Sequence, residues 1–187
     1  MSGTQSFESV RSPAVASLFY PKNPMELLQN VRDLLDETSQ DVDLPDERIL
    51  RALIVPHAGY VYSGSTAAKA YRLLKNYRNV FRRIILLGPA HRVWIQGLAF
   101  PRVEAFETPL GRIPLAVKQI RELLRFPEVK LRDDAHLEEH CLEVQLPFLQ
   151  ELLGNFDLIP GVVGETCLLY TSPSPRDATL SRMPSSA

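Results

Sequence analysis

The fold is decided by two stretches of the sequence, Ile49-Leu-Arg-Ala-Leu-Ile-Val-Pro-His57 and Ile84-Ile-Leu-Leu-Gly-Pro-Ala-His91. Each begins as a short apolar run and ends at proline or glycine, which is typical of a parallel strand buried on both faces. Between them, residues 67–74 repeat apolar side chains with helical spacing after Ser65, which can cap a helix. A strand, a helix and a strand in this order form a right-handed crossover, so we expect the two strands to lie parallel in one sheet.

Further elements on both sides extend this pattern. The spacing of apolar residues predicts helices over residues 24–37, with Asn23 as the cap, and over 115–125 and 137–153, and strands over 97–100 and 156–159. Pro147 removes an amide donor from the last helix, so a kink or a late start is expected there. The prolines of residues 11–21 indicate an extended arm laid over the core. Alternating helices and strands predict an α/β three-layer sandwich with a mainly parallel central sheet.

Composition and charge exclude several classes of protein. With 187 residues, 45% of them hydrophobic, the chain is long enough for one domain. Its formal net charge of -1 would not attract nucleic acid or an anionic membrane, so small-molecule, peptide or protein partners fit better. No apolar run approaches the roughly 18 residues of a membrane span, and residues 1–12 lack the apolar segment of a signal peptide, which predicts a cytoplasmic protein. The absence of a glycine-rich nucleotide loop and of a Gly-x-Ser-x-Gly motif argues against nucleotide-binding and serine-hydrolase functions.

From Cys167 onward the composition changes abruptly to serine and proline without helical or strand period. This string resembles one reading frame of a transposase-type sequencing-library adapter, with residues 178–180 at the variable index. We therefore expect residues 167–187 to be a non-native, disordered tail, and residues 1–166 to be the N-terminal part of a single domain whose sheet would continue. A native flexible tail is the alternative. Cys167 carries no functional prediction, and Cys141 is expected to be a small buried residue rather than a nucleophile.

His57 and His91 follow the two predicted strands at their carboxyl ends. Because open α/β sheets bind ligands at that edge, the two imidazoles are expected to reach one shared pocket. A neutral imidazole offers a lone pair to a divalent metal, so two of them with a third ligand would form an open site for zinc, copper or iron. They could instead act as an acid and a base near neutral pH. The remaining alternative is two loop histidines that bond to backbone carbonyls.

The loop after the first predicted strand carries two glycines and two tyrosines. Gly59 and Gly64 allow a tight turn that would present Tyr60, Tyr62 and Ser63 toward the pocket. Tyr62 is therefore a candidate for binding substrate. The alternative is that the tyrosines cover the core.

A second candidate group lies farther along the chain. His136, His140 and Glu143 are spaced i, i+4, i+7 and would share one helical face. The pair of histidines has a metal-ligand spacing, but Leu137 stands where zinc peptidases carry glutamate, so His136 is not favoured as a ligand. His140 is predicted to be a catalytic residue oriented by Glu143, which would also contact substrate. A solvated or capping role for His140 is the alternative.

Five blocks of sequence in order together resemble the Memo family, called AmmeMemoRadiSam system protein B in bacteria and archaea. The blocks are Ala14-Val-Ala-Ser-Leu-Phe-Tyr-Pro21, Pro56-His-Ala-Gly-Tyr-Val-Tyr-Ser-Gly64, Gly88-Pro-Ala-His91, Thr108-Pro-Leu-Gly111 and Glu139-His-Cys-Leu-Glu-Val-Gln-Leu-Pro-Phe-Leu149. They cover essentially all of residues 11–164. The resemblance implies a fold similar to the catalytic subunit of class III extradiol dioxygenases, which use non-haem iron, although a shared fold does not transfer the reaction.

The resemblance also implies that His57 and His91 are metal ligands, with iron or copper as the metal. The third ligand of the family is a cysteine in its C-terminal part, which this chain does not contain, and Cys167 stands in the wrong context to replace it. Two functions follow from the resemblance. The first is a metal-dependent, redox-active protein in which His140 helps to polarise a substrate, with this chain itself expected to be inactive. The second is a non-catalytic adaptor whose pocket receives a partner peptide, because eukaryotic members are linked to signalling and cytoskeletal control.

Overall fold

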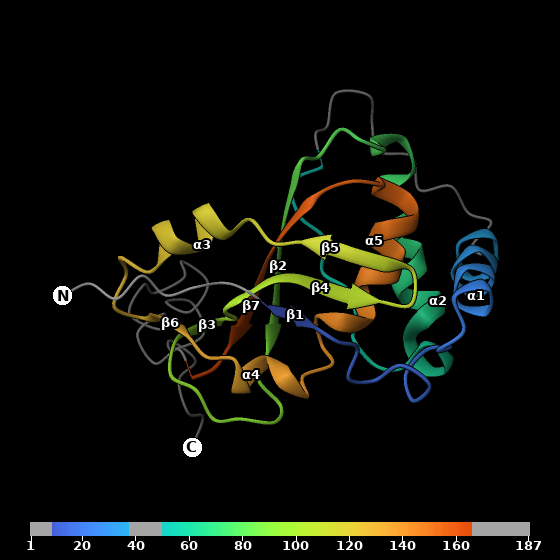
Figure 1. Cartoon of the computed structure of the whole chain (residues 1–187). Coiled ribbons are helices and arrows are strands. Elements are labelled where there is room, and N and C mark those ends of the chain that lie inside the picture. Colours follow the sequence, from blue (N-terminus) through green and yellow to red (C-terminus); the bar gives the residue numbers. More distant parts are fainter. Residues whose placement is uncertain (1–8, 38–49, 166–187) are drawn as a thin grey trace, which may run out of the picture.

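The larger sheet positions the candidate site. Its strands are β2 (Arg83–Pro89), β7 (Asp157–Val163), β3 (Leu98–Phe100) and β6 (Val129–Leu131), in that order across the sheet. The pairs β2–β7 and β3–β6 are parallel, whereas β3 runs antiparallel to β7. This computed structural model describes residues 9–37 and 50–165 (Figure 1).

The smaller sheet joins β1 (Ser9–Arg11), β4 (Val103–Thr108) and β5 (Gly111–Pro114). Strand β1 is parallel to β4, and β4 and β5 form an antiparallel hairpin. The predicted α/β class is confirmed, but the predicted mainly parallel central sheet is wrong, because both sheets are mixed. The connection from β4 to β5 is too short for the crossover that a parallel pair requires, so these strands must run antiparallel.

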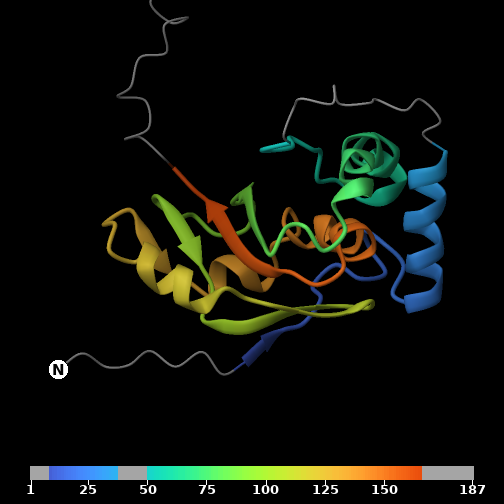
Figure 2. The same cartoon turned by 90° about the horizontal axis from the view of Figure 1, so that it is seen from above.

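Three helices gather at one end of the molecule, and a fourth lies at the other (Figures 1 and 2). The group comprises α1 (Pro24–Asp36), α2 (Tyr60–Tyr71), which continues as the 3-10 helix η1 (Arg72–Tyr77), and α5 (Leu146–Leu153). The helix at the opposite end is α3 (Val117–Leu123). The predicted helices over 24–37 and 115–125 are therefore confirmed, and the side chain of Asn23 caps α1 by accepting hydrogen bonds from two backbone amides.

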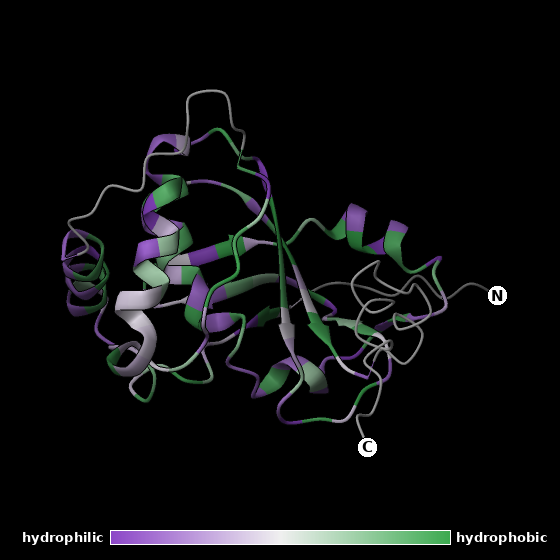
Figure 3. Cartoon of the chain, turned by 180° about the vertical axis from the view of Figure 1, so that it is seen from behind, coloured by the Kyte–Doolittle hydropathy of each residue, from purple (hydrophilic) through white to green (hydrophobic). Residues whose placement is uncertain are grey.

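The main core lies between the helix group and the sheets. Phe148 of α5 is buried there, with its ring 5.0 Å from that of Tyr60 and 5.1 Å from that of Tyr71. Helix α1 contributes the apolar positions that its helical period predicted, Leu27, Val31 and Leu35. Seen from behind, β2 and β7 lie side by side and are coloured largely as hydrophobic (Figure 3). Among the residues that the structure describes, no helix is long and apolar enough to cross a membrane.

The predicted strand over residues 49–55 is wrong for residues 50–55, which form no strand. Ile54 is 99% exposed, although the sequence pattern placed it in a buried strand. The predicted strand at 84–87 is confirmed as β2, but its parallel neighbour is β7. A strand exists only where another strand pairs with it, and no described segment pairs with residues 50–55. Ile49 and the tail over 167–187 lie outside the described residues.

Two local predictions around helices also require correction. The predicted single helix over 137–153 is replaced by α4 (Asp134–Leu137), a 3-10 turn η2 (Glu143–Gln145) and α5. The late start expected from Pro147 is confirmed, because this proline lies in the first turn of α5. The predicted tight turn between Gly59 and Gly64 is wrong, because Gly59 precedes the first residue of α2 and Gly64 lies inside that helix.

Candidate metal centre

Three histidines from separate segments of the chain meet in the structure. His91 follows β2, His57 precedes α2, and His140 lies between α4 and η2. The ring centroids are 5.1 Å apart for His57 and His91, 4.6 Å for His91 and His140, and 5.9 Å for His57 and His140. One nitrogen from each ring can be chosen so that all three lie within 4.8 Å of one another. The two histidines predicted from the strand ends therefore share one place, and His140 joins them; we call this group the histidine cluster.

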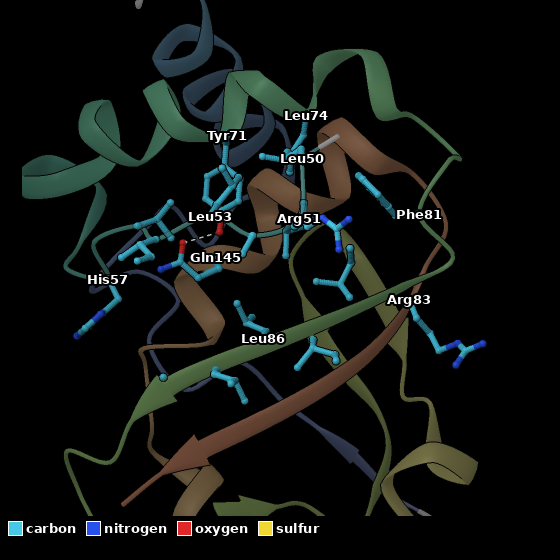
Figure 4. A pocket seen from close by; sticks show the side chains of 18 of the residues that line it. Leu50, Arg51, Leu53, His57, Tyr71, Leu74, Phe81, Arg83, Leu86 and Gln145 are labelled. Carbon is cyan, nitrogen blue, oxygen red and sulfur yellow. Dashed lines mark hydrogen bonds between the residues drawn. The ribbon is translucent and has the colours of Figure 1, made fainter. Parts of the chain in front are cut away.

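Two close contacts hold the cluster together. A Cβ atom at Gly88 would lie 2.5 Å from Sγ of Cys141, so only glycine lets the end of β2 approach the segment that carries His140. On the other side, Nε2 of Gln145 donates a hydrogen bond of 3.0 Å to the carbonyl of Pro56. The Tyr71 hydroxyl bonds to the same Gln145 at 2.8 Å (Figure 4). The backbone next to His57 is therefore fixed by side chains of the core.

Glu139 belongs to this site but was not predicted from the sequence as a site residue. Its buried carboxylate accepts hydrogen bonds from the backbone amides of His91, His140 and Cys141, at 2.7 to 3.0 Å. Burial opposes its ionisation, but the amides of Cys141 and His91 and the His91 ring lower the pKa of Glu139 to about 2. The one available signal was its position directly before His140, because a carboxylate often lies beside a histidine that binds metal.

The ionised Glu139 fixes which nitrogen of His91 carries the proton. An ionised carboxylate can only accept, so Nδ1 of His91 is the donor in the 2.9 Å bond between them. In the neutral ring this leaves the lone pair on Nε2, where it can bind a metal ion. A carboxylate that orients a histidine in this way is the usual partner of a metal-binding imidazole.

The other two imidazoles are also suited to a metal ion. Burial lowers the pKa of His57, and the neighbouring His91 lowers it further. Burial also lowers the pKa of His140, against the opposing effect of Glu139. Both rings are therefore neutral near pH 7, which is the form that binds metal. Nδ1 of His140 lies 3.2 Å from Glu139 without hydrogen-bond geometry, and among the described residues this buried atom has no hydrogen-bond partner.

A second combination of possible ligands overlaps the histidine cluster but fits a metal less well. His91, Glu139 and Cys141 also bring their donor atoms within 4.8 Å of one another. Burial raises the pKa of the Cys141 thiol, which donates a hydrogen bond to the Pro89 carbonyl at 3.2 Å. A metal requires the thiolate, and Glu139 already accepts several hydrogen bonds. Cys141 is buried, as predicted.

A pocket of about 570 Å³ opens beside the cluster. Its lining includes His57, His140, Leu18, Phe19 and Tyr62. The Phe19 ring lies 4.8 Å from that of His140, and the Tyr62 side chain is largely exposed at the pocket wall. Tyr62, selected from the sequence as a substrate contact, therefore lies where it could meet a bound molecule. Tyr60 instead is buried and bonds to a backbone carbonyl of the core.

Glu143 has a different position from the one that the sequence suggested. It is fully buried, and its carboxylate accepts hydrogen bonds from Arg11, from the amides of Ala14 and Val15 and from the Tyr20 hydroxyl. No hydrogen bond joins it to His140 in the described part of the chain. The prediction that His136, His140 and Glu143 share one helical face was wrong, because α4 ends before His140. Glu143 fastens the arm formed by residues 11–21 to the core, over which the arm was predicted to lie. The prediction that the arm is extended is wrong for residues 17–19, which form a turn.

His136 is not part of the cluster. It is buried, with Nε2 3.0 Å from the carbonyl of Ala99. Burial lowers its pKa from 6.5 to about 4, so the ring is neutral and Nε2 donates this hydrogen bond. The prediction that disfavoured His136 as a metal ligand agrees with this position.

Replacing His136 by Gln is expected to flatten the dependence of stability on pH between about 6.5 and 4. The unfolded chain binds a proton at this histidine in that window and the folded chain does not, so stability falls as the pH falls. A change in pKa of this size corresponds to about 3 kcal/mol. Urea unfolding at a series of pH values measures the effect. Parallel curves for the two proteins would show that His136 does not cause it.

Comparison with known proteins gives the family. A family model described as Memo-like protein matches residues 11–168. A MEMO1 family protein of Aquifex aeolicus is 39% identical over 156 residues, which are 82% of this chain and 55% of that relative. MEMO1 family proteins of Thermotoga neapolitana and Thermoplasma volcanium are 35% and 36% identical, and the matches cover 88% and 83% of this chain and 60% and 56% of the relatives. The chain thus spans a little more than half the length of these relatives. The resemblance inferred from the five sequence blocks is confirmed, and the chain belongs to the Memo family.

Proposed function

We propose that His57, His91 and His140 hold an iron or copper ion, and that the ion acts on a small molecule bound in the neighbouring pocket. The observation that carries this proposal is the meeting of three imidazoles, one of which has a buried nitrogen without a hydrogen-bond partner among the described residues. Such a nitrogen is costly unless something binds it. A metal ion would supply that partner.

The residues around the ion would each have a separate task. Bound iron or copper would supply Lewis-acid and one-electron redox chemistry at the pocket wall. Glu139 keeps the proton of His91 on Nδ1, so that the lone pair of Nε2 would be available to the ion. Phe19 and Leu18 line one side of the pocket and Tyr62 another, where they would contact the bound molecule.

The test is the metal content of the protein after loading with ferrous or cupric ions and removal of the excess. Wild-type protein is expected to retain metal, and the double variant His57→Ala with His91→Ala is expected to lose it, because two of three ligands are gone. His136→Gln is the matched control, since this histidine lies outside the cluster and should leave metal content unchanged.

Two results would contradict the metal proposal. Equal metal content in wild type and double variant would mean that the ion binds elsewhere, and no retained metal in either protein would mean that the cluster does not hold one. The adaptor function is the competing proposal, and the exposed side chains of Leu18 and Tyr62 at the pocket favour it. Peptide binding that survives in the double variant would support an adaptor.

A further inference from the structure

The three segments that carry the histidine cluster are held in different ways. His91 follows β2, which pairs with β7 along its whole length, and its ring bonds to Glu139. His140 donates its backbone amide to the same carboxylate. His57 instead lies at the end of residues 50–57, which form no helix or strand. Its position beside the other two rings therefore depends on contacts outside regular secondary structure.

A single hydrogen bond holds this segment. Nε2 of Gln145 donates to the carbonyl of Pro56, directly before His57, at 3.0 Å, and among the described residues this is the only hydrogen bond that residues 50–57 form. Proline has no amide proton, so the carbonyl is the only backbone group through which Pro56 can be held in this way. Gln145 is buried, so water does not compete for the bond.

The same amide also reaches the segment of a second histidine. Nε2 of Gln145 donates a longer hydrogen bond, of 3.5 Å, to the carbonyl of Cys141, which directly follows His140. One NH₂ group therefore lies between the carbonyl that precedes His57 and the carbonyl that follows His140. The amide cannot be turned around, because its oxygen would then face two carbonyl oxygens that can only accept.

Tyr71 fixes the oxygen of this amide. Its hydroxyl donates to Oε1 of Gln145 at 2.8 Å, the bond drawn as a dashed line in Figure 4. Burial raises the pKa of Tyr71, so the hydroxyl stays protonated and remains a donor. The Tyr71 ring in turn stacks on Phe148 of α5, with an interplanar angle of 12°. The core of the protein therefore sets the direction in which Gln145 presents its NH₂ group.

We propose that Gln145 is a positioning residue of the metal centre, and that its amide holds His57 beside His91 and His140 before an ion binds. The part of this inference that concerns the ion rests on the proposed function. A ligand that is already in place raises affinity, because the apparent affinity falls with the fraction of molecules in which the site is formed. The NH₂ group of Gln145 bonds to carbonyls and is not itself a ligand. Gln145 therefore acts on the ion through His57.

The test replaces Gln145 by Met, which has a similar length but no amide, and measures cupric affinity by competition with a chelator. Affinity is expected to fall about tenfold, the lower end of the usual effect of removing a group that supports a metal ligand. In a His57→Ala background the same replacement should change affinity by less than about twofold, because the ligand through which Gln145 acts is gone. An equal loss in both backgrounds would overturn the proposal, since Gln145 would then act on the fold as a whole. Electron paramagnetic resonance should show nitrogen coupling from three imidazoles in wild type and from two in Gln145→Met.

The metal-free protein tests the positioning by itself. Nuclear Overhauser contacts between the ring protons of His57 and His91, whose centroids are 5.1 Å apart, are expected in wild type and should be absent from Gln145→Met. The contact between His91 and His140, at 4.6 Å, should remain in both proteins. A contact between His57 and His91 that persists in the variant would overturn the proposal, whether or not the protein binds metal. Loss of that contact in a protein that retains no metal would contradict the proposed function alone.

Gln150→Met is the matched control. Gln150 accepts a hydrogen bond from the Thr108 hydroxyl at 2.6 Å and donates one to the Gly111 carbonyl at 3.2 Å, which repeats the bonding of Gln145 away from the cluster. This replacement should leave cupric affinity and the ring contacts unchanged. An effect as large as that of Gln145→Met would overturn the proposal, because loss of any such glutamine would then disturb the centre.

If Gln145→Met does not fold, the wild-type protein provides the answer. Coupling between two events is reciprocal, so a bound ion should strengthen the bond from Gln145 to Pro56 by the factor that this bond adds to the affinity. Zinc suits a site of three imidazoles and does not broaden the spectrum. In protein that carries zinc, the side-chain amide protons of Gln145 are therefore expected to exchange about tenfold more slowly than in the metal-free protein. Unchanged exchange would overturn the proposal.

Discussion

Replacing Glu143 by Gln is expected to lower the free energy of unfolding by about 3–5 kcal/mol, the range for breaking a buried ion pair. Glu143 lies 2.7 Å from Arg11, and neither side chain is appreciably exposed. Its two oxygens also accept hydrogen bonds from Ala14, Val15 and Tyr20. An amide would replace one accepting oxygen by an NH₂ group that faces other donors. Burial and the nearby Glu143 raise the pKa of Tyr20, so its hydroxyl stays protonated and donates to Glu143 in the wild-type protein.

Urea unfolding of the two proteins at neutral pH measures this change. Arg32→Gln is the matched control, because Arg32 forms an ion pair of the same length, 2.7 Å, with Glu151 but is 52% exposed. Exposed pairs contribute about 0–1 kcal/mol, so the control should differ little from wild type. A Glu143→Gln effect as small as that of the control would mean that the arm over residues 11–21 is held by its apolar contacts instead.

Glu143→Gln is also expected to loosen the packing beside the histidine cluster. The arm carries Phe19, whose ring packs on His140 at a centroid distance of 4.8 Å. Loss of the Glu143 contacts frees the arm, and with it one wall of the pocket. Glu143 therefore supports the site through the arm, although the sequence suggested a direct contact with substrate.

The histidines were predictable because their signal is local. His57 and His91 each follow an apolar run within a few residues, and in the structure their rings lie 5.1 Å apart although only the second run forms a strand. His91 does follow a strand. His57 reaches the same place from a segment that is not a strand, held by the hydrogen bond from Gln145 to Pro56. The prediction of the site was thus less sensitive to error than the prediction of the sheet.

The sheet itself could not be predicted from local pattern. Residues 50–55 and β2 have the same apolar character, yet only β2 has a paired neighbour, β7, which lies about 70 residues away in sequence. The identity of that neighbour depends on the whole chain. The strands β4 and β5 were missed because their mixed polar and apolar residues, such as Glu104, Glu107 and Arg112, hide the alternation of a hairpin.

The segment that carries His140 shows how a side chain can override helical period. The spacing of His136, His140 and Glu143 fits a helix, but the carboxylate of Glu139 binds the amides of His140 and Cys141. Those amides would donate to carbonyls four residues earlier in a continuous helix. An acidic side chain that bonds to nearby backbone amides favours a break in the helix. The break turns His140 toward His57 and His91, which a helix would not do.

Replacing Glu139 by Gln is therefore expected to weaken metal binding at the histidine cluster by about 10–100-fold, the usual effect of removing the group that orients a metal-binding histidine. The neutral amide loses the charge that holds the proton of His91 on Nδ1, so Nε2 is presented to the ion for less of the time. Competition between the protein and a chelator for cupric ion measures the affinity. Glu138→Gln, an exposed neighbour with the same change of charge, is the control and should bind as wild type does.

The metal-free protein provides an independent measurement on the same residue. The pKa of Glu139 falls from 4.5 to about 2 on folding, so its ionised form stabilises the fold above about pH 4.5, and this stability is lost as the pH falls toward 2. The loss amounts to about 3 kcal/mol for a change in pKa of this size, and Glu139→Gln should not show it. The variant and wild type could lose the same stability in acid while the variant still binds metal more weakly. The bond from His91 to Glu139 would then affect metal binding but not the stability of the fold. If neither quantity changes, Glu139 does not organise the centre, and the histidines must be positioned by Gly88 and Gln145.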